Sequence, residues 1–205
     1  MTASIHIAVI DDDEAVLDSL RLYFARQNID TACFASAKDF LAAIDRGERF
    51  DCVVSDVRMP GMSGLDLVHN LKGRGLAAPV ILITGHGDVD MAVSAVKAGA
   101  FDFIEKPFDE TRLLASIRDA VEKGRQRISD AVEQEKILAR FEALSARQRE
   151  VMELAVAGLS SKEIGTRLKI SPKTVENHRA WVMLRMGARN VAELVRIAMQ
   201  LERRV

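Results

Sequence analysis

Five short apolar runs alternate with longer segments of helical pattern in the first 120 residues of the chain. Near-continuous apolar character is typical of strands that are buried on both faces, as in a parallel sheet. The helical patterns between the runs predict crossover helices, and a fifth pattern begins near residue 109. This alternation predicts an α/β fold with a doubly wound, five-stranded parallel sheet of the flavodoxin-like kind. The predicted strands are residues 4–10, 30–34, 51–56, 79–84 and 100–105, and the helices between them are residues 14–27, 36–45, 64–72 and 88–98.

The fifth helical pattern continues beyond the point at which a compact domain of this kind ends. Its apolar residues keep an approximately heptad spacing, although Gly124 and Glu135 interrupt the seam. A charged, solvated helical linker over residues 123–142 is the simplest interpretation. A coiled-coil contact between two copies and an irregular linker are the alternatives. The spaced residues are Ile117, Val121, Ile128, Val132 and Leu138.

Residues 143–205 contain four further helical patterns with clear start and stop signals. Ser145 and Ser171 stand where helix N-caps are expected. Pro172 is the first residue of the helix that Ser171 caps, and Gly187 follows the last residue of that helix. Two short helices that meet at a tight turn, with Lys and Arg on the second, are typical of a helix-turn-helix that enters the DNA major groove. The pattern predicts a small all-α domain of four helices after the linker.

Composition and charge favour a two-domain chain in which one domain is basic. The 205 residues are 48% hydrophobic, which suits two separate cores. Residues 1–138 contain 16 Lys and Arg against 23 Asp and Glu, and residues 139–205 contain 13 against 7, so the net charges are −7 and +6. Only the basic part is expected to meet a polyanion. With no run of about 18 apolar residues and no signal peptide, a cytoplasmic protein without membrane contact is expected.

Several polar side chains follow the carboxyl ends of different predicted strands, where ligands bind in sheets of this type. Asp11 to Asp13 follow the first strand, Asp56 ends the third, Thr84 ends the fourth and Lys106 follows the fifth. Carboxylates this close repel one another, and such a cluster of hard oxygen ligands suits Mg²⁺ in phosphoryl chemistry. Asp56 is placed to attack a phosphoryl group and form an aspartyl phosphate. The Thr84 hydroxyl and the Lys106 ammonium suit the oxygens of that group.

Residues 1–122 resemble the receiver domain of bacterial two-component response regulators, and the FixJ regulators of nitrogen fixation in particular. The resemblance rests on the segments DVRMPGMSGLDL and ILITGHGDVDMAVSAVKAGAFDFIEKPF. It implies that Asp56 is the phosphoacceptor and that Mg²⁺ is the cofactor. For His86 it leaves loop structure and switching as alternatives, and Asp13 receives no ligand role. The implied metal site is Asp11, Asp12, Asp56 and the backbone carbonyl of Arg58; the implied phosphoryl contacts are Thr84 and Lys106, the switch residues are Thr84 and Phe103, and the Lys106–Pro107 peptide is cis.

The helix-turn-helix segment resembles the DNA-binding domain of the LuxR, NarL and FixJ family along its whole length. Spacing along the third helix separates a buried stripe, which includes His178, from an opposite face for DNA. Asn and Glu pair with base edges and Ala contacts a thymine methyl, whereas Lys and Arg more often hold phosphate. Trp181 and Leu184 depart from the family pattern, where smaller or polar residues are expected. The predicted DNA contacts are Lys162, Lys173, Thr174, Glu176, Asn177, Arg179 and Ala180.

Together the two domains predict a phosphorylation-activated transcription factor and not an enzyme. A sensor histidine kinase phosphorylates Asp56, the receiver forms a homodimer, and the C-terminal domain binds double-stranded promoter DNA. The expected outcome is activation of transcription, with RNA polymerase as a further candidate partner. The expected dimer face is helix 88–98 with strand 100–105, where Val89 and Val93 pack across a twofold axis. The only catalysis expected is the receiver's own phosphoryl transfer and autodephosphorylation.

Two alternatives from other functional classes remain open. The first is an aspartyl-phosphate phosphatase, because Asp11-x-Asp13 begins the motif of such enzymes, although Ala15 fills the place of its Thr or Val. The second is a receiver coupled to RNA binding. Continuous substrate turnover would support the first, and preference for single-stranded RNA would support the second.

Overall fold

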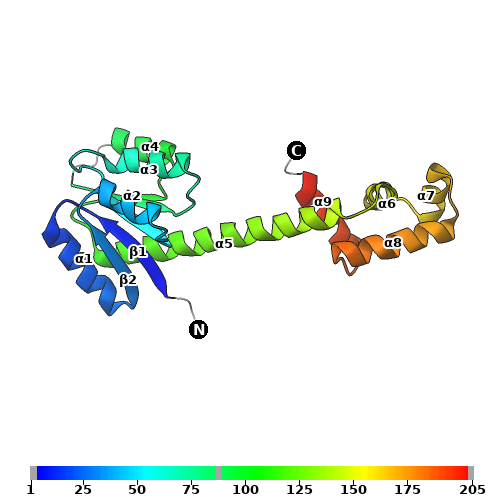
Figure 1. Cartoon of the computed structure of the whole chain (residues 1–205), viewed down its shortest axis with the longest axis horizontal. Helices are drawn as coiled ribbons and strands as arrows, with labels where there is room; N and C mark the ends of the chain where they lie inside the picture. The colour runs from blue at the N-terminus through cyan, green and yellow to red at the C-terminus, as the bar shows by residue number, and fades with distance from the viewer. Residues whose placement is uncertain (1–3, 86–88, 203–205) are drawn as a thin grey trace. The chain divides into compact units, whose positions relative to one another are not determined.

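The computed structural model describes residues 4–85 and 89–202. These residues fall into two compact units that divide between Arg127 and Ile128. Each unit has hydrophobic clusters of its own, and Figure 1 shows their elements. The first unit is the α/β domain that the apolar runs predict, and the second contains the four predicted C-terminal helices.

A five-stranded sheet forms the centre of the first unit. The strand order is β2-β1-β3-β4-β5, and every neighbouring pair is parallel. This order is that of the flavodoxin-like doubly wound sheet, so the predicted fold class is confirmed. The strands are β1 Ile5–Ile10, β2 Ile29–Phe34, β3 Cys52–Asp56, β4 Val80–Thr84 and β5 Asp102–Glu105.

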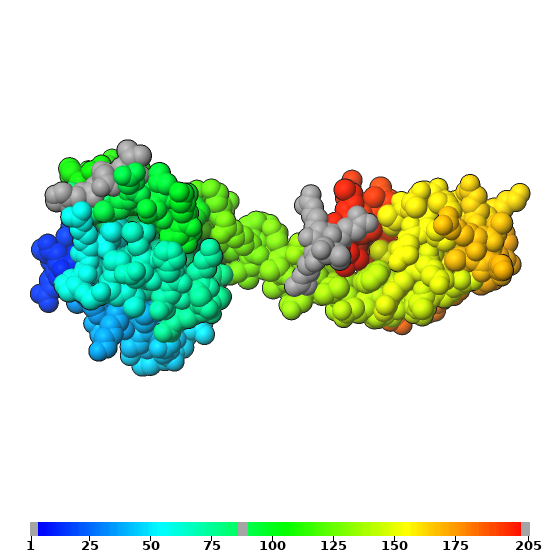
Figure 2. Space-filling view, turned by 90° about the horizontal axis from the view of Figure 1, so that it is seen from above, coloured from blue at the N-terminus to red at the C-terminus, as the bar shows by residue number. Residues whose placement is uncertain are grey.

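Helices cover both faces of this sheet. Successive strand residues point to opposite faces, so Val54 packs in the cluster with α1 and α5, whereas its neighbour Val53 packs in the cluster with α2, α3 and α4. The face of this unit that Figure 2 shows is formed largely by segments coloured light blue to green. The helices are α1 Glu14–Arg26, α2 Ala37–Asp45, α3 Gly64–Gly73, α4 Val89–Ala98 and α5 Glu110–Glu142.

Side-chain caps determine where the helices beside the predicted site begin. The Asp13 carboxylate accepts a hydrogen bond of 2.9 Å from the Ala15 N–H and caps α1. Ser63 and Asp66 form a capping box at the start of α3, in which each side chain accepts from the other residue's N–H. The hydrogen bonds from Ser63 lower the pKa of the Asp66 carboxyl group. Caps of this kind contribute on the order of 1 kcal/mol each and hold the loops between strand and helix in place.

The helix α5 is continuous from Glu110 to Glu142 and contributes to the cores of both units. Ile117 packs against the sheet, and Ile137 packs among the C-terminal helices. Between them Ile128 and Val132 are exposed. Residues 123–142 are therefore helical, as the linker interpretation predicts, and the structure groups residues 128–142 with the second unit. No helix within the described ranges is long and apolar enough to cross a membrane.

The second unit contains α6 and α7, the turn between α7 and α8, and a final helix, α9. Ser171 caps α8, Pro172 is its first residue, and Gly187 ends it in the left-handed conformation with φ 72°, which glycine adopts without strain. Within α7, Gly165 lies so close to the turn that leads to α8 that a Cβ there would be 2.8 Å from the Ile170 carbonyl oxygen. The tight helix-turn-helix thus depends on glycine at this position. The helices are α6 Ala146–Val156, α7 Ser161–Leu168, α8 Pro172–Met186 and α9 Val191–Glu202.

Candidate functional site

The carboxyl ends of four strands of the sheet bring the predicted polar residues to one edge. Asp11 directly follows β1, Asp56 is the last residue of β3, and Thr84 is the last residue of β4. Lys106 follows β5, and its backbone N–H donates to the Thr84 carbonyl oxygen at 2.7 Å. Parallel pairing of these strands therefore places residues from four distant parts of the sequence side by side.

A salt-bridged group of Asp11, Lys106 and Asp56 lies at this edge. The Lys106 Nζ atom is 2.8 Å from Asp11 Oδ2 and 2.8 Å from Asp56 Oδ1. Asp11 is only 2% exposed and Asp56 only 7%. Buried carboxylates are costly unless a cation and hydrogen bonds compensate them. Lys106 therefore supplies the positive charge that the cluster of acidic residues requires.

Backbone N–H groups bind the remaining oxygens of the two carboxylates. The Arg58 N–H donates to Asp56 Oδ2 at 2.6 Å, and the Asp13 N–H donates to Asp11 Oδ1 at 3.0 Å. Burial alone would lower the pKa of the Lys106 ammonium, but its hydrogen bonds and charge interactions with Asp11 and Asp56 outweigh burial and raise that pKa. Lys106 is thus held as a cation, and Asp56 is held in one orientation.

The oxygens of this group fit a hard divalent cation. Each of the four carboxylate oxygens of Asp11 and Asp56 accepts one hydrogen bond and retains further lone-pair capacity, since a carboxylate offers about four acceptor sites. Oxygen donors of this type are those that Mg²⁺ prefers. Asp12 is exposed, and no group of three or more His, Cys, Asp or Glu side chains in the described part of the chain is arranged to hold a metal ion. The structure therefore brings Asp11 and Asp56 together, but not Asp12 with them.

Gly64 is a supporting residue that sequence reasoning missed. Its N–H donates to the Val57 carbonyl oxygen at 3.0 Å. A Cβ at this position would lie 2.4 Å from the Asp56 carbonyl oxygen and 2.9 Å from a methyl group of Leu82. The N-terminus of α3 therefore packs directly on the backbone of Asp56. The sequence signal was the glycine within MSGLD, but only the three-dimensional contact reveals its role.

The predicted switch residues lie on β4 and β5. Thr84 is fully buried, and Phe103 is partly buried against the cluster that contains α4. The Lys106–Pro107 peptide is cis, as the resemblance implies. His86 lies outside the described residues, as does the side chain of Val89. On α4, Val93 and also Val96, which sequence reasoning did not single out, are exposed.

The helix α8 presents different residues on its two sides. Val175, Val182 and Met186 are buried, as their spacing predicts, and His178 is partly buried beside them. Trp181 is 53% exposed. The exposed residues among the predicted DNA contacts on this helix are Lys173, Thr174, Glu176, Asn177 and Ala180.

The cationic residues predicted to contact DNA have different environments. Lys162 on α7 is exposed. Lys173 is exposed as well and lies 3.3 Å from the Glu176 carboxylate, one turn along α8. Arg179 is partly buried, and its Nη1 atom donates to the Leu159 carbonyl oxygen at 3.4 Å. The structure therefore leaves Lys162 and Lys173 at the surface, but turns Arg179 toward the interior side of α8.

The chain belongs to the response regulators that combine a receiver with a LuxR-type DNA-binding domain. Residues 7–118 match the response regulator receiver domain family, and residues 142–198 match the bacterial regulatory proteins of the luxR family. The protein is therefore a phosphorylation-dependent transcriptional regulator of a two-component system and not a classical enzyme. Neither match supports the phosphatase or the RNA-binding alternative.

Similar proteins extend over nearly the whole chain. It is 47% identical to the transcriptional regulatory protein FixJ of Bradyrhizobium diazoefficiens, over 98% of this chain and 97% of that protein. It is 44% identical to the C4-dicarboxylate transport transcriptional regulatory protein DctR of Rhodobacter capsulatus, over 96% of this chain and all (100%) of that protein. Among solved structures, the response regulator StyR aligns with a TM-score of 0.81 and 34% identity, covering 97% of this chain and 100% of that one. Full-length FixJ from B. japonicum aligns with a TM-score of 0.63 and 44% identity, covering 98% and 99%.

Proposed function

We propose that Asp56 accepts a phosphoryl group from a sensor histidine kinase. One oxygen of its carboxylate attacks the phosphorus, the bond from phosphorus to the kinase histidine breaks, and an aspartyl phosphate forms. The observation that carries this proposal is the sharing of Lys106 by Asp56 and Asp11 at the end of a central strand, at 2.8 Å from each. The ammonium that neutralises Asp56 in the resting protein is thereby in reach of the incoming phosphoryl oxygens.

Mg²⁺ is the cofactor that this proposal requires. Asp11, Asp12, Asp56 and the Arg58 backbone carbonyl would hold it, and the ion would neutralise charge on the phosphoryl oxygens. Asp12, which is exposed in the structure, would have to turn toward Asp11 to join this set. The Lys106 ammonium would bind one phosphoryl oxygen, and the Thr84 hydroxyl would bind a second one. Hydrolysis of its own aspartyl phosphate would be the receiver's only further reaction.

Dimerisation through α4 and β5 would follow phosphorylation. The aspartyl phosphate adds a charge of about −1.5 to −2 beside Thr84, and inward movement of that hydroxyl would give Phe103 room to turn. The exposed side chains of Val93 and Val96 on α4 offer apolar surface for contact with a second copy across a twofold axis.

The basic C-terminal unit would then bind double-stranded promoter DNA through α8. Asn177 and Glu176 would read base edges and Ala180 a thymine methyl, while Lys162, Lys173, Thr174 and Arg179 would contact the backbone. Arg179 would first have to give up its hydrogen bond to the Leu159 carbonyl, which is long at 3.4 Å. Activation would proceed through contact with RNA polymerase, and a protein with these partners would act in the cytoplasm.

The phosphoacceptor is tested by incubating the full chain with acetyl phosphate and Mg²⁺ and weighing it by mass spectrometry. Asp56→Asn keeps the shape of the side chain but removes the nucleophile, so this variant should gain no phosphoryl group. Asp13→Asn is the matched control, because Asn also caps a helix and Asp13 contributes no side chain to the salt-bridged group. Uptake by the Asp56→Asn variant at the normal rate would disprove the assignment.

The dimer face is tested by light scattering before and after phosphorylation. The wild type should double its mass, and Val96→Asp should remain a monomer because it buries a charge in the contact. Leu22→Asp replaces an equally exposed apolar residue on α1 and should dimerise normally. An unchanged mass of the phosphorylated wild type at micromolar concentration would exclude this mode of activation.

A further inference from the structure

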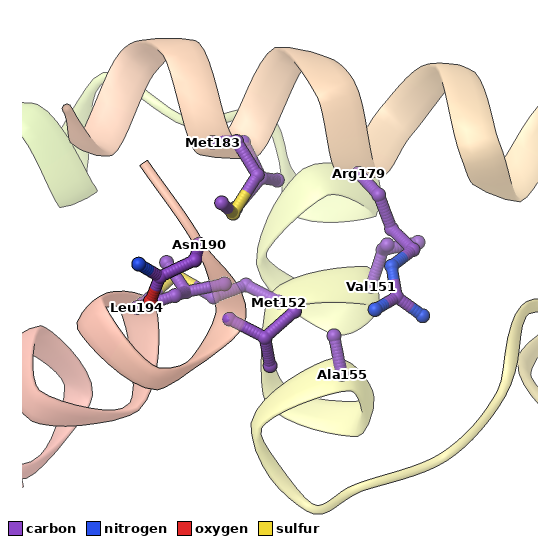
Figure 3. A pocket seen from close by; sticks show the side chains of 9 residues that line it. Val151, Met152, Ala155, Arg179, Met183, Asn190 and Leu194 are labelled. Carbon is purple, nitrogen blue, oxygen red and sulfur yellow. The ribbon is translucent and has the colours of Figure 1, made fainter. Parts of the chain in front are cut away.

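A cavity of about 270 Å³ lies within the DNA-binding unit, between α6, α8 and α9. Figure 3 shows side chains from all three helices pointing into it, with Met183 and Arg179 reaching from α8 toward α6. Phosphoryl transfer does not use this cavity, and among the residues proposed to contact DNA only Arg179 lines it. The lining residues are Val151, Met152, Ala155, Arg179, Val182, Met183, Asn190, Val191 and Leu194.

The wall of the cavity is almost entirely apolar. An apolar cavity of about 150 Å³ stays dry and binds benzene, so this larger one has room for a chain of several methylene groups. Met152 and Met183 face each other across it (Figure 3). Thioether side chains are flexible and polarisable, so they adapt to ligands of irregular shape. The wall therefore suits a flexible aliphatic chain.

Arg179 places one positive charge at the edge of this apolar wall. Arg179 is partly buried, and its side-chain hydrogen bond to the Leu159 carbonyl is 3.4 Å long. It forms no ion pair with any residue in the described ranges. A guanidinium has five donors, and a charge that is partly removed from water without a counter-ion is destabilising. An anion bound here would neutralise the charge of Arg179 and accept hydrogen bonds from its free donors.

Asn190 provides a second polar group at the edge of the cavity. Its Oδ1 atom accepts from the Glu193 N–H at 2.9 Å and caps α9. The side-chain NH₂ group of Asn190 is therefore left as a donor. Asn190 and Arg179 lie at opposite ends of the cavity (Figure 3). Only the Arg179 end combines hydrogen-bond donors with a positive charge, so that end is suited to an acceptor-only anion such as a carboxylate.

We propose that this cavity binds a small aliphatic monocarboxylate, whose carboxylate pairs with Arg179 and whose chain lies between Met152 and Met183. The site is separate from the exposed residues of α8, such as Lys173 and Asn177, because it lies on the opposite side of that helix. A ligand there contacts α6, α8 and α9 together and so stabilises the packing of α8, the helix proposed to read DNA. It also holds Arg179, so a bound carboxylate competes with the DNA backbone for that side chain. The site would make the DNA-binding unit responsive to a metabolite independently of phosphorylation.

Octanoate, octanol and octylamine are the probes, since they share one chain and differ in the charge of the head group. Calorimetric titration of the full chain without DNA should show saturable binding of octanoate, at least about tenfold tighter than octanol or octylamine, which corresponds to about 1.4 kcal/mol. Nuclear magnetic resonance of the methionine methyl groups should show shifts at Met152 and Met183. Because DNA is absent, the outcome does not depend on the DNA contacts proposed above.

Two variants test the polar groups without removing the apolar wall. Arg179→Gln should abolish the tenfold preference for octanoate over octanol. Asn190→Asp keeps the helix cap, because Asp caps as well as Asn does, but adds a negative charge and should weaken octanoate alone. Equal affinity for octanoate and octanol in the wild type, or an unchanged preference in Arg179→Gln, would overturn the proposal. Absence of methyl shifts, or shifts that follow protein concentration and so report contact between two copies, would overturn it as well.

Discussion

Replacement of Gly64 by alanine is the most direct test of how the fold positions the phosphoacceptor. Gly64 begins α3 and packs on the last residue of β3. The added Cβ would lie 2.4 Å from the Asp56 carbonyl oxygen, 2.9 Å from a Leu82 methyl group and 3.1 Å from the Val57 Cα atom. Two of these three atoms belong to the backbone and cannot turn away. Relief of the contact therefore requires that α3 or the end of β3 move.

The expected change in unfolding free energy is the difference between two opposing contributions. Overpacking of a well-packed site costs about 1–3 kcal/mol, whereas replacing glycine in a helix by alanine gains about 0.5–1 kcal/mol. We expect the Gly64→Ala receiver to lose about 1–2 kcal/mol of unfolding free energy, which lowers its melting temperature by several degrees. Displacement of Asp56 by about 1 Å should slow phosphorylation by up to about 100-fold.

Gly73→Ala is the matched control at the other end of the same helix. A Cβ on Gly73 would meet no atom within 4 Å, so this variant should be as stable as the wild type or more stable by up to about 1 kcal/mol. Differential scanning calorimetry of both full-length variants measures stability, and uptake of phosphate from acetyl phosphate measures function. If Gly64→Ala melts and reacts like Gly73→Ala, the close packing of α3 on Asp56 does not position the phosphoacceptor.

Three further predictions concern other parts of the chain. Because the pKa of Lys106 is raised in the folded protein, its contribution to stability is complete below its ordinary pKa of 10.5 and is lost as the pH rises through the pKa of the folded state. Urea titrations at alkaline pH should therefore show a fall in unfolding free energy that the Lys106→Met variant does not show. Lys169 caps α7 in the left-handed conformation with φ 55°, so Lys169→Gly should stabilise the second unit by about 1 kcal/mol in thermal unfolding; a decrease would contradict this. In DNA titrations over a range of salt, Asn177→Ala should lose about 1–3 kcal/mol of discrimination at one base pair, whereas Lys173→Ala should weaken all sequences alike and lower the salt slope by about 1. Full discrimination by the first variant, or an unchanged slope in the second, would mean that these residues do not have the proposed roles.

The sequence predicted the sheet and its helices well because both signals are local. Buried parallel strands are continuous apolar runs, and the predicted caps Ser145 and Ser171 occur at the helix starts that the structure has. The crossover topology then determines which strand ends are neighbours. The sequence alone therefore assigns Asp11, Asp56, Thr84 and Lys106 to one edge of the sheet.

The partners of individual side chains could not be predicted in the same way. The sequence suggested a metal ion as the positive charge among the acidic residues, whereas the structure pairs Asp11 and Asp56 with Lys106, which lies 50 residues or more away along the chain. Arg179 was expected at the DNA face with Lys173. Successive side chains on a helix point in directions about 100° apart. In the structure the Arg179 side chain points toward the Leu159 carbonyl. Contacts of this kind depend on tertiary packing, which spacing alone does not encode.

The distribution of aromatic residues gives each domain its own optical signal. The chain contains one Trp and one Tyr: Trp181 is on α8 and is 53% exposed, and Tyr23 is on α1 and packs against the receiver core. Indole emission therefore comes only from α8, and phenol emission only from the receiver. Quenching of Trp181 fluorescence would report contact with DNA, and a change in Tyr23 fluorescence would report unfolding of the receiver. Neither measurement needs an attached dye.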